Sequence, residues 1–416
     1  MIVSNSSWIN LTVAMMLCIF MMTSVDIFAQ YHDEKVSKKA YKLAQKYGII
    51  DGHVDLPYRL RIKNFRLQKE YLGIPYQTDE GDFDYVRARK GGLVGPFMSI
   101  FIPSNYQTDG GAVELADSLI NMVEYIAKNQ SEYFQLAYSP KDVLQAKKNN
   151  KIALPMGMEN GAPVEDDLSK IAYFKKRGIS YITLTHAKDN KICDSSYDTT
   201  RTWKGLSPYG YKAIDEMTNV GIIIDISHVS DSTFYQVLRH VKVPVIASHS
   251  SCRKYTPGFE RNMSDEMISS MKKNGGIIMV NFGSTFLDSR VTAYNDSLRT
   301  VFTNLLTEKG IEPKSSQAED LEKEFQKSYP KLYSDVAMVA DHIDHIVSLA
   351  GIDHVGLGSD YDGVGDSLPT GLKDVSDYPN LIGELLKRGY SKSDIKKICI
   401  GNLFRVWNVV IKASKR

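Results

Sequence analysis

Short apolar runs alternate with amphipathic helical stretches along most of this chain. The clearest example lies between Gly221 and Ser251, where the runs IIIDI and VPVIAS flank DSTFYQVLRHV, whose apolar residues have helical spacing. A strand, a helix and a strand within about thirty residues form a βαβ unit with two parallel strands. Each run ends in Ser-His, so we expect His228 and His249 to lie at the same edge of a sheet.

The same alternation predicts eight strands. Their ranges are 48–55, 93–101, 152–159, 179–186, 222–226, 243–248, 275–282 and 354–360. Helices are predicted between them, and a polar, charged insertion at 284–333 is also predicted to be helical. Buried parallel strands alternating with helices predict a single α/β domain, a (β/α)8 TIM-type barrel with extra helices and loop insertions. A doubly wound open sheet is the alternative, but it favours a glycine-rich turn where this chain has Asp51-Gly52-His53.

Ionisable residues end six of the predicted strands. They are His53 with Asp55, Glu159, His186, His228, His249 and Asp360. A barrel gathers the carboxyl ends of its strands around one rim, and residues two apart on a strand face the same side. Each residue alone is more typical of a loop hydrogen bond, but their joint placement predicts a metal centre.

Five of these residues are too many ligands for one tetrahedral zinc ion. They are His53, Asp55, Glu159, His228 and His249. Such a set suits two ions that share a carboxylate. The pairs Asp341-His342 and Asp344-His345 also have metal-like spacing, but they fall within a predicted helix. We therefore expect them on a solvated helix face in the outer ring of the barrel.

Composition and charge narrow the class of protein. The chain has 416 residues, 43% of them hydrophobic, and a net charge of +2, which indicates neither nucleic-acid binding nor a polybasic membrane contact. Residues 1–29 contain a central apolar run and resemble a secretory signal peptide; an uncleaved N-terminal anchor is the alternative. We predict an exported protein, periplasmic or secreted, with one domain over 30–416 and no stable membrane span after cleavage.

The cysteines of the predicted mature chain do not indicate a disulfide framework. Cys193, Cys252 and Cys399 show no paired spacing in a chain of this length. A single bridge between two of them remains open.

Several stretches together resemble the membrane (renal-type) dipeptidase family, di-zinc peptidases of the amidohydrolase superfamily. They include DGHVDLP (51–57), GMENG (157–161), YITLTHAKDN (181–190), IDISHVS (224–230), VIASHSS (245–251), VGLGSDYDG (355–363) and GNLFRVW (401–407). The resemblance runs in order from about residue 47 to the C-terminus. It implies a (β/α)8 barrel that binds two Zn²⁺ ions, and it suggests a homodimer.

The resemblance also implies a role for each residue of the rim. His53 and Asp55 would hold one zinc ion, His228 and His249 the other, and Glu159 would bridge both. The nucleophile would be a metal-bridged hydroxide.

The same resemblance assigns three further residues. Asp360 would be the general base, and His186 would contact the substrate and stabilise the developing oxyanion. Arg261 would bind the terminal carboxylate of the substrate, with a surface salt bridge as the alternative for this residue.

We therefore expect a zinc-dependent hydrolase of small dipeptides. A related metal-dependent amidohydrolase, acting on a lactam or another small C–N substrate, is the alternative. A ligand-binding or envelope-scaffold protein on an inactive barrel is a third possibility, which the complete ligand set disfavours. The sequence leaves open the side-chain and stereochemical preference, the metal loaded in vivo and the oligomeric state.

Overall fold

The computed structural model describes residues 35–62 and 75–415, so the predicted signal peptide lies outside the described residues. Eight parallel strands form one sheet in the order β1-β2-β5-β6-β7-β8-β9-β10. The strands are β1 (Ile49–Val54), β2 (Leu93–Phe101), β5 (Met156–Glu159), β6 (Ile179–Thr183), β7 (Ile223–Asp225), β8 (Ile246–Ala247), β9 (Ile277–Val280) and β10 (Val355–Leu357). This order follows the chain, as a barrel requires and a doubly wound sheet does not.

The first strand meets the end of the last one and brings the sheet round into a barrel. A parallel bridge joins Val54 to Tyr361. The Asp55 amide donates to the Tyr361 carbonyl at 2.8 Å, and the Asp360 amide donates to the His53 carbonyl at 3.1 Å. The predicted (β/α)8 barrel is therefore confirmed, and its closure places the ends of β1 and β10 side by side.

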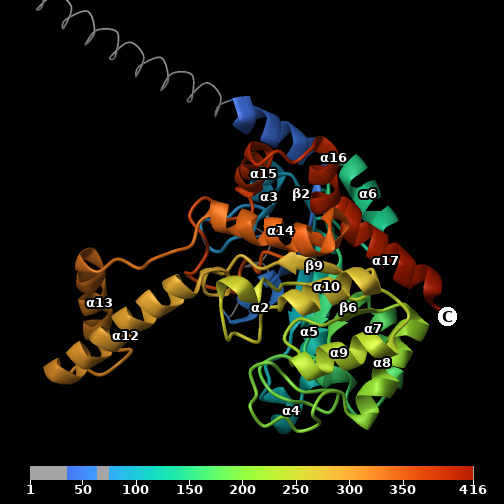
Figure 1. Ribbon diagram of the computed structural model, residues 1–416, viewed down its shortest axis with the longest axis horizontal. Helices are drawn as coiled ribbons and strands as arrows, with labels where there is room; N and C mark the ends of the chain where they lie inside the picture. Colours follow the sequence, from blue (N-terminus) through green and yellow to red (C-terminus); the bar gives the residue numbers. More distant parts are fainter. Residues whose placement is uncertain (1–34, 63–74, 416) are drawn as a thin grey trace, which may run out of the picture.

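Helices surround the barrel (Figure 1). Besides a helix over residues 35–47, they are α2 (Leu56–Ile62), α3 (Tyr85–Gly91), α4 (Tyr106–Asp109), α5 (Ala112–Asn129), α6 (Pro140–Lys148), α7 (Ser169–Lys176), α8 (Pro208–Val220), α9 (Asp231–His240), α10 (Asp265–Asn274), α11 (Ser284–Leu287), α12 (Ser289–Lys309), α13 (Ser316–Ser328), α14 (Val336–Ala350), α15 (Tyr378–Lys387), α16 (Lys392–Lys396) and α17 (Asn402–Ala413). Local caps set several boundaries. In α10 the Ser264 side chain accepts from the Met267 amide, and Gly275 ends the helix in the left-handed region at φ 81°.

The predicted strand at 152–159 is wrong as a single strand. It divides at Pro155 into β4 (Ile152–Leu154), which pairs with β3 (Phe134–Leu136) in a separate two-stranded sheet, and β5, which enters the barrel. Proline has no amide hydrogen to donate to a ladder, although the Pro155 carbonyl still accepts from the Met98 amide at 2.8 Å. Two short buried strands and one long one have the same apolar pattern, so the sequence did not reveal the division.

Apolar side chains fill the barrel interior beneath the rim. Phe97 of β2 lies between Tyr181 of β6 and Trp407 of α17, with ring centroids 5.3 and 5.1 Å away, and all three residues are fully buried. The C-terminal helix α17 thus packs into the core that the strands enclose. The ionisable side chains lie at the rim, at the carboxyl ends of the strands.

The predicted insertion at 284–333 is helical, as expected. Its helices α12 and α13 extend away from the barrel as an arm (Figure 1). Phe302 and Phe325 join the two helices with ring centroids 5.3 Å apart.

Two other expectations concern cysteines and membranes. Cys193, Cys252 and Cys399 are all buried and free, so these three form no disulfide with one another. Within residues 35–62 and 75–415, no helix is both long enough and apolar enough to cross a bilayer.

Candidate metal centre

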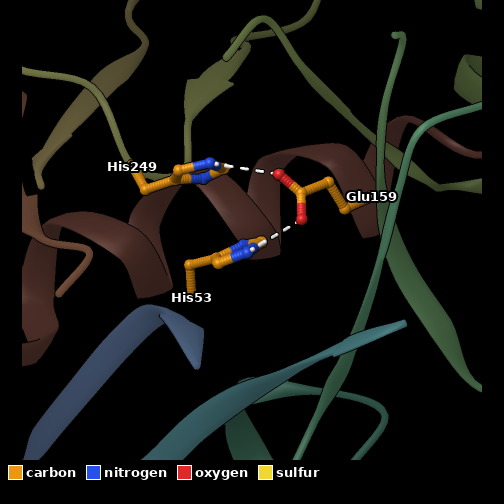
Figure 2. Close-up of side chains that lie close together, drawn as sticks. All are labelled: His53, Glu159 and His249. Carbon is orange, nitrogen blue, oxygen red and sulfur yellow. Dashed lines mark ion pairs between the residues drawn. The ribbon is translucent and has the colours of Figure 1, made fainter. Parts of the chain in front are cut away.

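Glu159, at the end of β5, is the meeting point of four histidines. Its Oε1 lies 3.0 Å from Nε2 of His228, 3.3 Å from Nε2 of His249 and 3.8 Å from Nε2 of His186. Its Oε2 lies 3.3 Å from Nε2 of His53. Figure 2 shows the imidazoles of His53 and His249 turned toward this carboxylate. Asp55 completes the group, with its Oδ2 3.6 Å from Nε2 of His53.

His53 is held so that Nε2 faces the carboxylates. Its Nδ1 lies 2.9 Å from the hydroxyl of Tyr181, and that hydroxyl donates to the carbonyl of Gly52 at 3.0 Å. Because the hydroxyl proton goes to the carbonyl, His53 carries its proton on Nδ1. Nε2 is then directed at Glu159 and Asp55, which is the orientation that a metal ligand needs.

His249 is oriented in the same way by a second chain of hydrogen bonds. Its Nδ1 lies 2.7 Å from the Ser248 hydroxyl, which donates to Oδ2 of Asp225 at 2.6 Å. The Ser248 oxygen therefore accepts from Nδ1 of His249, and Nε2 is again left with a lone pair. Asp225 also accepts from the backbone amides of Ser227 and Ser248, at 3.0 and 2.9 Å. One buried carboxylate thus fixes the ends of both β7 and β8.

The pKa values of Glu159 and the facing histidines favour binding of a positive ion at this centre. Burial raises the pKa of Glu159, but the facing histidines outweigh it and hold that pKa well below its usual range. Burial lowers the pKa of His228 and of His249 well below the usual range, so both rings are neutral at pH 7. Burial also lowers the pKa of His53, but the acidic groups facing it raise that pKa well above the usual range. The carboxylates thus attract positive charge to this position.

Several buried polar atoms here have no hydrogen-bond partner, and such atoms indicate whether the residues fit a metal. They are Nε2 of His53, Oδ1 of Asp55 and Nδ1 of His228. Unpaired buried polar atoms are rare because each costs free energy. Three overlapping groups have ligand atoms within 4.8 Å of one another, and Glu159 belongs to two of them. Imidazole nitrogens and carboxylate oxygens gathered in this way fit divalent cations.

The turns after the strands carry backbone strain. His228 has φ 69° and Asp360 has φ 64°, both in the left-handed region that costs residues other than glycine about 1–3 kcal/mol. The neighbouring Gly363 is required by close approach. A Cβ there would lie 2.2 Å from Oδ2 of Asp55 and 2.4 Å from Oδ1 of Asp360. The strained turn thus packs both carboxylates against the metal centre.

Asp360 lies in a position to act as an acid or base. Asn281 donates to its Oδ2 at 2.7 Å, which leaves Oδ1 on the side of Asp55 and Gly363. Burial, together with the negative charges of Asp55 and Glu159, raises the pKa of Asp360 to about 7. A carboxyl group with that pKa can both accept and release a proton at neutral pH.

A cavity of about 690 Å³ opens above these residues. Its lining includes Asp55, Glu159, His186, His228, His249 and Asp360, together with Tyr58, Phe101, Tyr197 and Phe286. The side chain of His186 is 23% exposed, and its ring packs against Phe101 with centroids 4.7 Å apart. Six of the seven rim residues predicted from the sequence therefore line one small-molecule cavity, and His53 is fully buried.

Arg261 lies beside this cavity but does not line it. The residue is only 3% exposed. Its Nη1 donates to the Ser250 hydroxyl at 2.6 Å and its Nη2 to the His249 carbonyl at 2.7 Å. A surface salt bridge, the alternative for this residue, is therefore wrong.

The histidines of α14 lie outside the site, as predicted, but the expectation of a solvated face is wrong for His342. That residue is fully buried. Its Nδ1 accepts from the Cys252 amide at 2.9 Å, and its Nε2 lies 2.9 Å from the Leu287 carbonyl. It fixes α14 to the segments after β8 and β9, which the spacing of the motif does not reveal.

Comparison with known proteins identifies the family. The sequence profile of the membrane dipeptidase family, Peptidase family M19, matches residues 37–416. This chain belongs to that family. A relative named uncharacterized dipeptidase C965.12, from Schizosaccharomyces pombe, is 31% identical over 92% of this chain and 86% of its own length. The chain is therefore a metallo-dipeptidase, a hydrolase of peptide bonds.

Solved structures agree with the fold of this dipeptidase. The crystal structure of the probable dipeptidase PvdM from Pseudomonas aeruginosa superposes with a TM-score of 0.75 at 27% identity, covering 92% of this chain and 100% of that one. A metallopeptidase from Rhodobacter sphaeroides, solved with a phosphinate mimic of the dipeptide L-Ala-D-Ala, gives a TM-score of 0.70 at 21% identity, covering 87% and 99%.

The sequence did not predict the residues that orient the candidate metal ligands. Ser248 is the serine of the second Ser-His pair, and Asp225 lies two residues before the first pair, so the repeated Ser-His was a usable signal. Tyr181 lies 128 positions from His53 and gave none. Its ring also needs Gly157, where a Cβ would lie 2.0 Å from it.

Proposed function

We propose that this metallo-dipeptidase is a di-zinc enzyme whose bound metal would supply an activated water as the nucleophile. The observation that carries the proposal is the convergence of three Nε2 atoms on the two oxygens of one buried carboxylate. Those of His228 and His249 lie 3.0 and 3.3 Å from Oε1 of Glu159, and that of His53 lies 3.3 Å from Oε2. A carboxylate approached from both oxygens suits two ions better than one.

The ligands divide into two sets. His53 and Asp55 would hold one ion, His228 and His249 the other, and Glu159 would serve both. When bound, the ions supply Lewis acidity and lower the pKa of a water so that it can attack a peptide carbonyl at neutral pH. The tethered Nδ1 atoms of His53 and His249 keep both rings in the orientation that binding needs.

Two further residues would act on the substrate. Asp360, with its pKa near 7 and its Oδ2 held by Asn281, would accept a proton at Oδ1 and pass it to the leaving amine. His186, partly exposed in the cavity, would donate a hydrogen bond to the oxygen of the attacked carbonyl. That bond strengthens as negative charge develops, so it favours the transition state.

The substrate would be a small dipeptide, which suits a cavity of about 690 Å³. The composition of residues 1–29 supports export to the periplasm or the medium as part of the proposal. A homodimer is proposed on the family resemblance alone.

Metal analysis combined with a substrate panel tests the proposal. We expect purified protein to contain two zinc ions per chain and to hydrolyse Gly-, Ala- and Cys-Gly-type dipeptides. Chelation should abolish hydrolysis, and added zinc should restore it. Activity that survives complete metal removal would contradict the mechanism, and activity restricted to lactams would favour the alternative amidohydrolase.

A further inference from the structure

Asp51 is a fully buried carboxylate of β1, two residues before the candidate metal ligand His53. Its Oδ1 accepts from the His53 amide at 2.9 Å. The amide of Ser359, which follows β10, donates to both oxygens of the same carboxylate at 3.1 Å. One side chain therefore joins the backbone of a metal ligand to the residue that directly precedes the proposed general base, Asp360.

These contacts lie where the first strand of the barrel meets the last. Between β1 and β10, the described residues form one isolated parallel bridge, from Val54 to Tyr361. Ser359 is fully buried, and its amide is bonded to the carboxylate of Asp51. A buried amide needs an acceptor, and in a continuous ladder that acceptor would be a carbonyl of the neighbouring strand. Asp51 thus takes the place of a backbone partner at the junction of β1 and β10.

Helix α15 also holds Asp51. The hydroxyl of Tyr378, a fully buried residue of this helix, donates to Oδ2 of Asp51 at 2.6 Å. The ring of Tyr378 packs edge-on against that of Tyr361, with centroids 5.7 Å apart, and Tyr361 packs edge-on against Phe282 at 5.8 Å. Two amides and one hydroxyl therefore donate to a single carboxylate, which fixes its orientation.

The residue that follows Ser359 has a strained backbone. Asp360 has φ 64°, in the left-handed region, and such a conformation persists only where surrounding contacts hold it. The Asp360 amide donates to the His53 carbonyl at 3.1 Å. The strained turn is thus bonded to His53 directly and, through Asp51, to the His53 amide as well.

Asp51 can affect turnover only through the residues that it holds. Asp360 lines the cavity, whereas Asp51 is 0% exposed and is not part of the cavity lining. A substrate in the cavity therefore meets Asp360 and not Asp51.

We propose that Asp51 is a positioning residue that holds the general base Asp360 in register with the metal ligand His53. This inference rests on the proposed function, because it takes Asp360 as the base. The carboxylate of Asp51 fixes the His53 amide on one side and the Ser359 amide on the other. A displacement of about 1 Å at a reacting group can lower the rate by about 10²-fold. Loss of the Asp51 carboxylate should therefore act on kcat rather than on substrate binding.

Asp51→Ala removes all three hydrogen bonds. At saturating zinc we expect kcat for Ala-Ala to fall about 10- to 100-fold, with KM within about threefold of the wild type. Asp51→Asn keeps an oxygen that can accept from both amides, so it should recover most of kcat. The matched control is Asp84→Ala, which removes a buried carboxylate that accepts from the Arg87 amide at 2.8 Å in α3. Its kcat should match that of the wild type, and zinc content should be equal in all variants.

A double-mutant cycle with Asp360→Asn shows whether Asp51 acts through the base. In that background Asp51→Ala should cause no further loss of kcat, because no base is left to position. Tyr378→Phe removes a single hydrogen bond to Asp51 and provides a milder variant in case Asp51→Ala folds poorly. It should lower kcat by about 2- to 10-fold, the effect of one hydrogen bond, and this loss should also vanish in the Asp360→Asn background.

Hydrogen exchange of the chelated protein measures these contacts without turnover. Peptides that span Ser359 and Asp360 should exchange faster in Asp51→Ala than in the wild type or in Asp84→Ala, because the Ser359 amide loses its acceptor.

The alternative outcomes separate this inference from the proposed function. An unchanged kcat in Asp51→Ala, a loss of kcat that persists in the Asp360→Asn background, or unchanged exchange at Ser359 would each overturn the role of Asp51. Equal losses in Asp51→Ala and Asp51→Asn would also overturn it, since the charge rather than the hydrogen bonds would then act. All four outcomes leave the proposed function intact. If Asp360→Asn alone leaves kcat unchanged, Asp360 is not the base, and this inference fails together with that part of the proposed function.

Discussion

Two parts of the molecule bring histidines and aspartates together: the rim of the barrel and helix α14. In α14, His342 uses both ring nitrogens on backbone groups, and Nε2 of His345 lies 2.7 Å from Asp265. Asp341 and Asp344 both accept from Arg388, at 2.6 and 2.7 Å. In α14 the histidines and aspartates therefore hold the helix to its neighbours through hydrogen bonds and ion pairs.

At the rim, the same kinds of side chain keep ligand atoms open. Nδ1 of His53 and of His249 is tethered, by Tyr181 and by Ser248, which turns each Nε2 toward Glu159, and Nε2 of His249 also lies 2.9 Å from Nε2 of His228. The difference teaches that residue type and spacing do not make a metal site. What matters is whether neighbouring groups occupy the coordinating nitrogen with hydrogen bonds or orient it toward the site.

The largest expected effect is at the shared carboxylate. Glu159→Gln replaces one anionic oxygen by an amide donor, which cannot bind a cation. We expect zinc content to fall toward zero and dipeptide turnover to fall below detection, measured by elemental analysis and a hydrolysis assay. Two zinc ions retained per chain would show that Glu159 is not the bridging ligand.

Asp360→Asn should separate chemistry from metal binding. We expect kcat to fall by about 10²–10⁴-fold, as for loss of a general base, because an amide cannot accept the proton. Zinc content and thermal stability should match those of the wild type. A kcat within a factor of a few of the wild type would remove Asp360 from the mechanism.

Ser248→Ala tests the tether of His249. The hydroxyl orients the ring and relays the charge of Asp225, so its loss should weaken zinc affinity about 10- to 100-fold. Competition with a chelator of known affinity measures the change. Unaltered affinity would mean that packing alone holds the ring.

His342→Gln should change stability rather than activity. Burial lowers the pKa of His342 to about 4, below the unfolded value near 6.5, so the folded state binds fewer protons between these values. The stability from neutral His342 is complete above about pH 6.5 and is lost as the pH falls toward 4, by up to about 3 kcal/mol.

Urea unfolding of chelated protein at pH 7 and at pH 4.5 measures this dependence. The variant should be less stable at pH 7 but should lose less stability on acidification than the wild type. Zinc content and turnover at pH 7 should be unchanged. Equal pH dependence in both proteins would show that His342 does not titrate as the fold implies.

The smallest effect is expected at His345, whose side chain is 9% exposed. Its partner Asp265 is 52% exposed, so loss of this ion pair in His345→Gln should cost less than about 1 kcal/mol and leave zinc content unchanged. Urea unfolding at pH 7 provides the measurement. A loss of metal in this variant would break the contrast between α14 and the rim.

The sequence by itself determined the order of strands and the identity of the residues at their ends. This was possible because both are local properties: an apolar run of strand length and the ionisable residue that follows it. A parallel barrel then brings those ends to one rim whatever the loops do. His53, Glu159, His228 and His249 were therefore predictable as neighbours.

Only the tertiary structure decided how each group is used. The pairing of His53 with Tyr181, the burial of Arg261 behind Phe286 and the two backbone partners of His342 all join distant parts of the chain. The division at Pro155 also depended on which neighbour each half could pair with. Such contacts leave no periodicity in a sequence, because they depend on packing in three dimensions rather than on the spacing of residues along one element.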